Sequence, residues 1–317
     1  MKKYIIDINS NAEDRWKPII SDYKVEISNV FNKLNQMNNG LLSSLASGLI
    51  NIANKFGYVL YEDELNYISK ECAIPFGQLV MLQIMYELSA CCTSAVFPID
   101  GIPVHFRTMD WPLSELKEMT IIIDFQDKGK TKYSTVTWAG YIGILTAIKP
   151  NVCSISLNYR STGEGLVNNL LNLGKSYWPA GYLIRSVMDN DLNYSQIIDR
   201  LSNCKLVAPC YLIVCGIETE QCINIVRDRE SASIHQIDND KIVQTNIDPF
   251  VDCRSKNILY STERKQLAEQ IINDIQSNAG QVNDLFEKFR QFPIINEETV
   301  YMCAMIPKLN YMEVRVI

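Results

Sequence analysis

The sequence contains little histidine and none of the closely paired cysteines that a zinc site uses. His105 and His235 are its only histidines, and no two of its ten cysteines are spaced as C-x-x-C. A zinc ion therefore lacks a ligand set, and a nucleophile that depends on a histidine base is poorly supplied. Residues 174–176, Gly-Lys-Ser, lack the earlier glycine of a phosphate-binding loop, because position 169 is Asn169. We expect no metal and no cofactor, and we expect His105, inside an apolar stretch, to be a core residue.

Long apolar runs and a secretory signal are also missing. No stretch reaches the ~18 apolar residues that span a bilayer, because the richest one, residues 76–97, is interrupted by Gln78, Gln83 and Glu87. At the N-terminus, Asp7 and the asparagines after it interrupt the apolar core that a signal needs. We therefore expect a cytoplasmic protein whose ten widely spread cysteines are mostly buried thiols. The net charge of −6 argues against a nucleic-acid partner, which requires a basic face.

The composition is otherwise that of a globular protein, and the first third of the chain has helical patterns. Of the 317 residues, 47% are apolar and 21% are charged, so the chain can build a large core. Ser10 and Glu13 have the spacing of a capping box, and apolar residues at helical spacing follow from Trp16. Further helices are predicted over residues 41–56, 62–72 and 76–89.

From residue 92 the pattern changes to short β-branched runs separated by turn residues. Strands are predicted at residues 93–97, 104–107, 120–125, 133–138, 142–147 and 154–157, and strands this close in sequence should pair antiparallel. Helical patterns return at residues 166–173, 182–189, 194–201 and 260–289, with strands near 211–214, 222–226, 242–245, 300–305 and 312–317. Antiparallel sheets with grouped helices predict an α+β fold, an αββα sandwich preceded by a mainly helical N-terminal segment.

The junction between the two parts carries the most specific signal. Cys91 and Cys92 are followed by Thr93 and Ser94, and the tetrapeptide Arg-Thr-Met-Asp follows at residues 107–110. This combination resembles the acid ceramidase and N-acylethanolamine-hydrolysing acid amidase family of N-terminal nucleophile hydrolases. In that family a Cys-Thr-Ser begins the mature catalytic chain and an Arg-Asn-Met-Asp follows on the next strand.

The resemblance extends over nearly the whole chain. Segments similar to those of the family occur in order at residues 15–16, 139–146, 157–158, 206–209, 227–229, 243–246, 252–254 and 299–301. One departure concerns the position after Asn158, where the family usually has an acidic residue and this chain has Tyr159. That exchange bears on substrate choice and on the pH optimum.

An N-terminal cysteine carries a nucleophile and a base in one residue. A free α-amino group has a pKa of ~7.7–8.0 and a thiol one of ~8.5, so the amine can accept the thiol proton. Because Cys92 is internal, its amine exists only after the Cys91–Cys92 peptide bond is cut. The resemblance implies that the Cys92 thiol makes this cut by an N-to-S acyl shift followed by hydrolysis. It would divide the chain into a helical segment, residues 1–91, and a catalytic chain, residues 92–317.

The resemblance also implies a set of site residues around the Cys92 nucleophile. Arg107 would favour the thiolate, and Asp110 would accept hydrogen bonds from the amine. Asn158 and Asn246 would donate to the oxyanion of the tetrahedral intermediate. Arg254 would brace these catalytic residues, and Tyr159 and Trp138 would contact the substrate.

The implied activity is hydrolysis of lipid amides, N-acylethanolamines or ceramides, to a fatty acid and an amine. The two fragments would stay associated, with peripheral contact to a membrane or micelle, and the family by itself suggests a lysosomal location. Two alternatives remain open. One is an amidase of the penicillin V acylase or bile-salt hydrolase type, and the other is a lipid-binding module without turnover, which Tyr159 favours.

Overall fold

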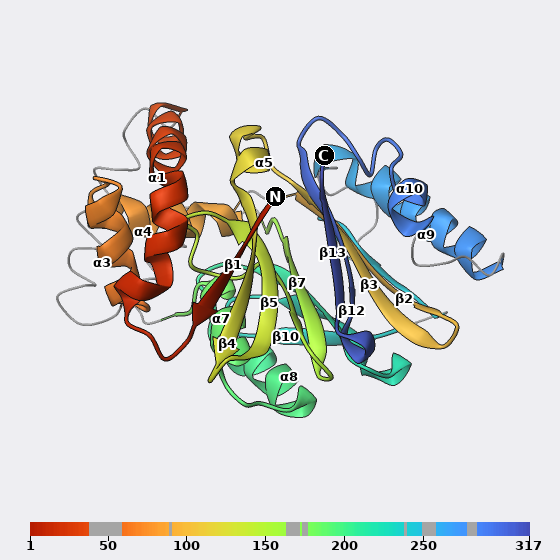
Figure 1. The fold of residues 1–317 in the computed structure, drawn as a ribbon. Coiled ribbons are helices and arrows are strands. Elements are labelled where there is room, and N and C mark those ends of the chain that lie inside the picture. Colours follow the sequence, from red (N-terminus) through yellow and green to blue (C-terminus); the bar gives the residue numbers. More distant parts are fainter. Residues whose placement is uncertain are drawn as a thin grey trace.

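The computed structural model of the chain is built around two facing β-sheets (Figure 1). It describes residues 1–37, 59–88, 91–162, 172, 177–237, 240–248, 258–277 and 284–317, with the backbone alone for residues 37 and 85–88. The larger sheet has the order β1 (Lys2–Asp7), β4 (Thr120–Asp127), β5 (Lys130–Trp138), β6 (Thr146–Lys149), β7 (Cys153–Tyr159), β8 (Cys210–Cys215), β9 (Cys222–Arg227), β10 (Ala232–Gln236). The smaller sheet has the order β11 (Ile242–Gln244), β2 (Cys91–Ile99), β3 (Ile102–Asp110), β12 (Thr299–Ile306), β13 (Tyr311–Val316).

Helices flank both sheets (Figure 1). They are α1 (Ala12–Met37), α3 (Glu62–Glu71), α4 (Phe76–Leu88), α5 (Glu115–Met119), α7 (Ala180–Asp189), α8 (Tyr194–Asn203), α9 (Ser261–Ser277) and α10 (Leu285–Lys288). Helices α9 and α10 pack on β2, β3 and β12, where Phe106 stacks on Phe289 at 4.2 Å between ring centroids. Helices α7 and α8 pack on the larger sheet, and α1, α3 and α4 lie beside its β1 edge (Figure 1). The predicted αββα sandwich is therefore confirmed. None of the described helices is both long and apolar enough to cross a bilayer.

The N-terminal segment is mainly helical, as predicted, but it begins with a strand that was not predicted. Residues Lys2–Asp7 form β1, which pairs parallel with β4 and so makes this segment an edge of the larger sheet. The capping box predicted at Ser10 is wrong, because the side chain of Asn11 accepts the hydrogen bond from the backbone N–H of Asp14. Helices α3 and α4 confirm two of the predicted helices, whereas the helix predicted over residues 41–56 lies outside the described residues.

Most predicted elements of the rest of the chain are present with shifted ends. The strand predicted at residues 142–147 begins only at Thr146, and β10 was not predicted. The predicted helix over residues 260–289 comprises α9 and α10, with residues 278–283 between them outside the described part. The helix predicted over residues 166–173 lies almost entirely outside it. The differences among the strands have a common cause, because strand ends and short edge strands depend on neighbours that are distant in sequence.

Candidate active site

The β2–β3 hairpin brings three of the predicted residues together. In its antiparallel register Cys92 lies opposite Met109, Ser94 opposite Arg107, and Cys91 opposite Asp110. Side chains that lie opposite each other point to the same face of a sheet, and neighbours along a strand point to opposite faces. Cys92 and Arg107 therefore face the larger sheet, whereas Asp110 faces the layer of α9.

The Cys92 thiol is held by an arginine in the closed interior. Arg107 Nη2 lies 2.7 Å from Cys92 Sγ, and neither side chain is exposed to solvent. The other terminal nitrogen of Arg107 donates to the Leu145 carbonyl at 2.9 Å and to the Thr146 hydroxyl. Burial raises the pKa of the Cys92 thiol, and the positive charge of Arg107 opposes that rise without reversing it. The buried thiol therefore favours its protonated form.

The backbone nitrogen of Cys92 is held by the amide of Asn246. It donates to Asn246 Oδ1 at 2.9 Å, and Asn246 Nδ2 donates to the Tyr159 carbonyl at 2.9 Å. The Asn246 oxygen therefore faces the nitrogen that cleavage would turn into a free amine. The resemblance predicted Asn246 as an oxyanion donor, and that role stays a prediction, whereas the structure places its amide at the Cys92 nitrogen.

An arginine that the sequence analysis did not identify braces this arrangement. Arg264, in the first turn of α9, donates to the Cys92 carbonyl at 2.6 Å and to Asn246 Oδ1 at 2.9 Å. It also lies 3.6 Å from the Asp110 carboxylate, and both side chains are fully buried. The predicted brace, Arg254, lies outside the described residues. Arg264 lies in a polar helical pattern and belongs to no motif, so its sequence context does not indicate that it contacts Cys92 and Asn246.

Asp110 is a buried carboxylate at the end of β3. Its Oδ1 accepts a hydrogen bond from the Thr299 hydroxyl at 2.8 Å. Burial raises the pKa of Asp110 to about 6, although Arg264 and Thr299 pull it down. This carboxyl consequently changes its charge in mildly acidic solution, next to the residues that hold Cys92.

The other predicted site residues that the structure describes are Asn158, Trp138 and Tyr159. Asn158 Nδ2 donates to the Gln244 carbonyl at 2.8 Å, and Asn158 Oδ1 accepts from the Ser94 hydroxyl at 2.8 Å. Asn158 thus joins the two sheets near Cys92, while its predicted oxyanion role stays a prediction. Trp138 is buried, with its ring centroid 5.8 Å from that of Trp111. Tyr159 is half-buried and contributes its carbonyl to Asn246.

His105 occupies the core position that its sequence context predicted. Its ring nitrogens lie 3.0 Å from the Ser154 hydroxyl and 2.8 Å from the Ser156 hydroxyl, and burial lowers its pKa to about 3. A histidine held neutral in this way packs the two sheets together. Within the described residues, no three His, Cys, Asp or Glu side chains gather as a metal site would require.

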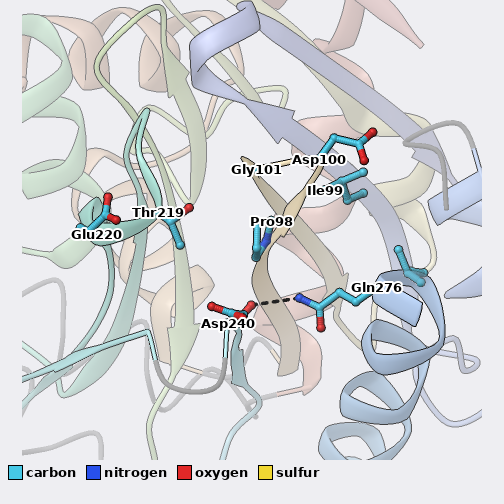
Figure 2. Close-up of a pocket in the computed structure, with 9 residues that line it drawn as sticks. Pro98, Ile99, Asp100, Gly101, Thr219, Glu220, Asp240 and Gln276 are labelled. Atoms are coloured by element: carbon cyan, nitrogen blue, oxygen red, sulfur yellow. Dashed lines mark hydrogen bonds between the residues drawn. The ribbon is translucent and has the colours of Figure 1, made fainter. Parts of the chain in front are cut away.

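A solvent cavity of about 520 Å³ lies at the other end of the same hairpin (Figure 2). The turn at Asp100 and Gly101 lines it, together with Glu220 and Asp240. Asp100 lies eight residue steps along the chain from Cys92, a distance of about 26 Å for extended strand at ~3.3 Å per residue. This acidic cavity is therefore remote from Cys92.

Comparisons with known proteins give similarities along the whole chain. A family model described as the beta subunit of N-acylethanolamine-hydrolyzing acid amidase matches residues 1–57. Uncharacterized protein R632 of Acanthamoeba polyphaga mimivirus is 31% identical, with 97% of each chain covered. Acid ceramidase of Bos taurus is 31% identical over 76% of this chain and 66% of its own length. N-acylethanolamine-hydrolyzing acid amidase of Caenorhabditis elegans is 27% identical over 97% of this chain and 90% of its own length.

A solved structure is similar as well. The Caenorhabditis elegans N-acylethanolamine-hydrolyzing acid amidase ortholog superimposes with a TM-score of 0.62 at 27% sequence identity. The match covers 71% of this chain and all of that chain.

Proposed function

Because this chain belongs to the acid ceramidase and N-acylethanolamine-hydrolysing acid amidase family, whose members hydrolyse amides, we propose that it cleaves lipid amides with Cys92 as the nucleophile. The observation that carries the proposal is the pair of contacts at Cys92. Its sulfur lies 2.7 Å from Arg107 Nη2, and its nitrogen donates to Asn246 Oδ1 at 2.9 Å. The substrates would be N-acylethanolamines or ceramides, and the products a fatty acid and an amine.

Activation would begin with the peptide bond between Cys91 and Cys92. The Cys92 sulfur attacks the Cys91 carbonyl carbon, the C–N bond breaks, and the Cys92 nitrogen leaves as an amine that has gained a proton. Water then hydrolyses the resulting thioester, so that Cys91 ends in a carboxylate and the Cys92 thiol is regenerated. Arg264 supports this step because its bond to the Cys92 carbonyl holds the residue on the far side of the cut.

In the mature enzyme the α-amine of Cys92 would act as the general base. It takes the thiol proton, the sulfur attacks the substrate carbonyl, and the amine then protonates the leaving nitrogen. Water, deprotonated by the same amine, releases the fatty acid from the acyl-thioester. Asn246 and Asn158 would donate to the oxyanion, a contribution for which the loss of one donor typically costs ~10²–10³ in kcat.

Arg107 and Asp110 would set the charges of this cycle. Arg107 lies in contact with the sulfur and stabilises the thiolate whenever it forms. Asp110 and Arg264 are both buried, 3.6 Å apart, and an ionised Asp110 balances the buried guanidinium. Since the pKa of Asp110 lies at about 6, the charge of the site changes across the mildly acidic range.

The segment before Cys92 would stay bound after cleavage. Its β1 strand pairs with β4 over six residues, and its Glu64 forms a buried ion pair with Arg185 at 2.6 Å. Separation of the fragments would expose a sheet edge and leave a buried charge without its partner. The family-model match to a beta subunit over residues 1–57 supports the same arrangement.

Intact-mass analysis and a substrate panel test the proposal together. The purified protein, taken through a pH series, should yield fragments of residues 1–91 and 92–317. Cys92→Ala should prevent both cleavage and turnover, whereas the neighbouring Cys91→Ala should leave the nucleophile working. Palmitoylethanolamide or a short-chain ceramide should be hydrolysed, with shorter acyl chains cleaved poorly, because each buried CH₂ contributes ~0.8 kcal/mol.

Three outcomes would contradict the proposal in different ways. An intact chain that still hydrolyses amides would exclude the amine of Cys92 as the base. Hydrolysis of penicillin V or a taurine conjugate without turnover of either lipid would favour the acylase alternative. Lipid binding without any product, in protein shown to be cleaved at Cys92, would indicate a binding module.

A further inference from the structure

A buried loop connects β5 to β6 next to the active site. Residues 139–145 form neither helix nor strand, and all seven are buried. Backbone groups of such a loop have to find protein partners, because an unpaired buried N–H or C=O is costly. The loop ends at Leu145, whose carbonyl accepts hydrogen bonds from Arg107 Nη1 and from the backbone N–H of Leu157, both at 2.9 Å. This loop therefore carries an anchor of the guanidinium that contacts Cys92.

The N-terminal segment supplies two of the partners that the loop needs. Gln83, in α4, is 1% exposed. Its Nε2 donates to the Gly140 carbonyl at 3.0 Å, and its Oε1 accepts from the Ile142 N–H at 2.9 Å. One side-chain amide thus pairs with the loop backbone as a neighbouring strand would.

Two further contacts tie the same loop to the N-terminal segment. Arg185 donates to the Ile142 carbonyl at 3.0 Å, and its guanidinium is paired with Glu64 of α3. Gly140 has a φ of +86°, and a Cβ at this position would lie only 3.0 Å from the Ile27 side chain of α1. Helices α1 and α4 therefore contact this loop directly, and α3 reaches it through Arg185 of α7.

We propose that Gln83 is a positioning residue for the amidase reaction and acts on Cys92 through the loop and Arg107. The segment before Cys92 then remains a working part of the enzyme after cleavage. The path is continuous, from the Gln83 amide to residues 140–142, from Leu145 to Arg107, and from Arg107 to the sulfur at 2.7 Å. This inference rests on the proposed function.

Gln83→Met tests the path because methionine has a similar shape and makes neither hydrogen bond. With the loop released, Arg107 should lose its fixed position beside the sulfur. We expect kcat to fall by about tenfold or more with little change in KM, because a shift of ~1 Å in a reacting group is costly. The pH profile of Cys92 alkylation, followed on the Cys92 peptide by mass spectrometry, should move up by about one unit. The matched control is Gln78→Met, the same exchange at a half-buried position of the same helix.

Gln83→Glu provides a second variant, in which the protonated and the ionised side chain can be compared by changing the pH. A protonated carboxyl can still donate to Gly140 and accept from Ile142, whereas an ionised carboxylate cannot donate. The charged groups near the loop are Arg185, which contacts the Ile142 carbonyl, and Glu64, which is paired with Arg185. Arg15 pairs with Glu64, Asp189 pairs with Arg185, and Arg107 contacts the loop at the Leu145 carbonyl. We expect this variant to approach wild-type kcat in acid and to lose more of it than the wild type as the pH rises. Circular dichroism at each pH should show a constant folded fraction.

The outcomes separate this inference from the proposed function. Cleavage and Cys92 alkylation need no substrate, so they report on Gln83 even if no lipid amide is turned over. Unchanged kcat and an unchanged alkylation profile in folded Gln83→Met would overturn the inference. The inference would also be overturned if Gln78→Met lowered kcat as much as Gln83→Met does. It would likewise be overturned if kcat in both Gln83 variants fell only in proportion to the unfolded fraction.

Discussion

Replacement of Asp110 by asparagine should stabilise the uncleaved fold at neutral pH and have little effect in acid. Burial raises the pKa of Asp110 to about 6 from an ordinary value of 3.8. Because the folded protein holds this proton more tightly than the unfolded chain, the resulting stabilisation is complete below pH 3.8 and is lost as the pH rises through about 6. A difference of about two units, at 1.36 kcal/mol per unit, gives roughly 3 kcal/mol.

Urea unfolding of the Cys92→Ala variant, which should stay uncleaved, provides the measurement. The free energy of unfolding gained by adding Asp110→Asn should grow by roughly 3 kcal/mol between about pH 4 and pH 7.5. The matched control is Asp100→Asn at the exposed turn of the same hairpin, where φ is +50° and asparagine is well tolerated. Parallel pH profiles with and without Asp110→Asn would refute the argument.

The same exchange should damage catalysis while it stabilises the fold. In the chain with Cys92 intact, Asp110→Asn keeps the acceptor for Thr299 but removes the charge that faces Arg264. We expect kcat to fall by well over tenfold. Wild-type rates in this variant would show that the charge of Asp110 has no part in catalysis. A gain in stability together with a loss of activity is the pattern of a strained functional residue.

Other residues of the site give separate tests. Arg107→Lys keeps the positive charge but cannot contact both Cys92 Sγ and the Leu145 carbonyl. We therefore expect the pKa read from the Cys92 alkylation profile to rise and kcat to fall by ~10². Arg264→Met should slow cleavage more than Arg254→Met does, and equal effects in mass-based cleavage assays would count against Arg264 as the brace. Glu64→Gln leaves Arg185 without its buried counter-charge and should cost ~3–5 kcal/mol in urea unfolding, whereas a loss below ~1 kcal/mol would contradict this.

Much of the active-site hairpin could be predicted from the sequence because its contacts are local. Cys92, Arg107 and Asp110 lie on two adjacent strands joined by a tight Asp-Gly turn, and the alternation of a strand decides which of them share a face. The strand runs, the turn and the motif spacing are all visible within a window of about twenty residues. The pattern of antiparallel strands and grouped helices likewise predicted the αββα sandwich.

Tertiary structure alone decided the partners that reach this hairpin from far along the chain. Arg264 lies in an ordinary polar helix, and Gln83 interrupts an apolar one, so neither carries a local signal of its contacts with Asn246 or Ile142. Strand β1 became part of the larger sheet because β4 offered it an edge, which its own sequence does not specify. Three features depend on which surfaces come into contact: the charge balance of buried groups, the hydrogen bonds of a buried loop and the pairing of strands. These contacts form only when the whole chain has packed.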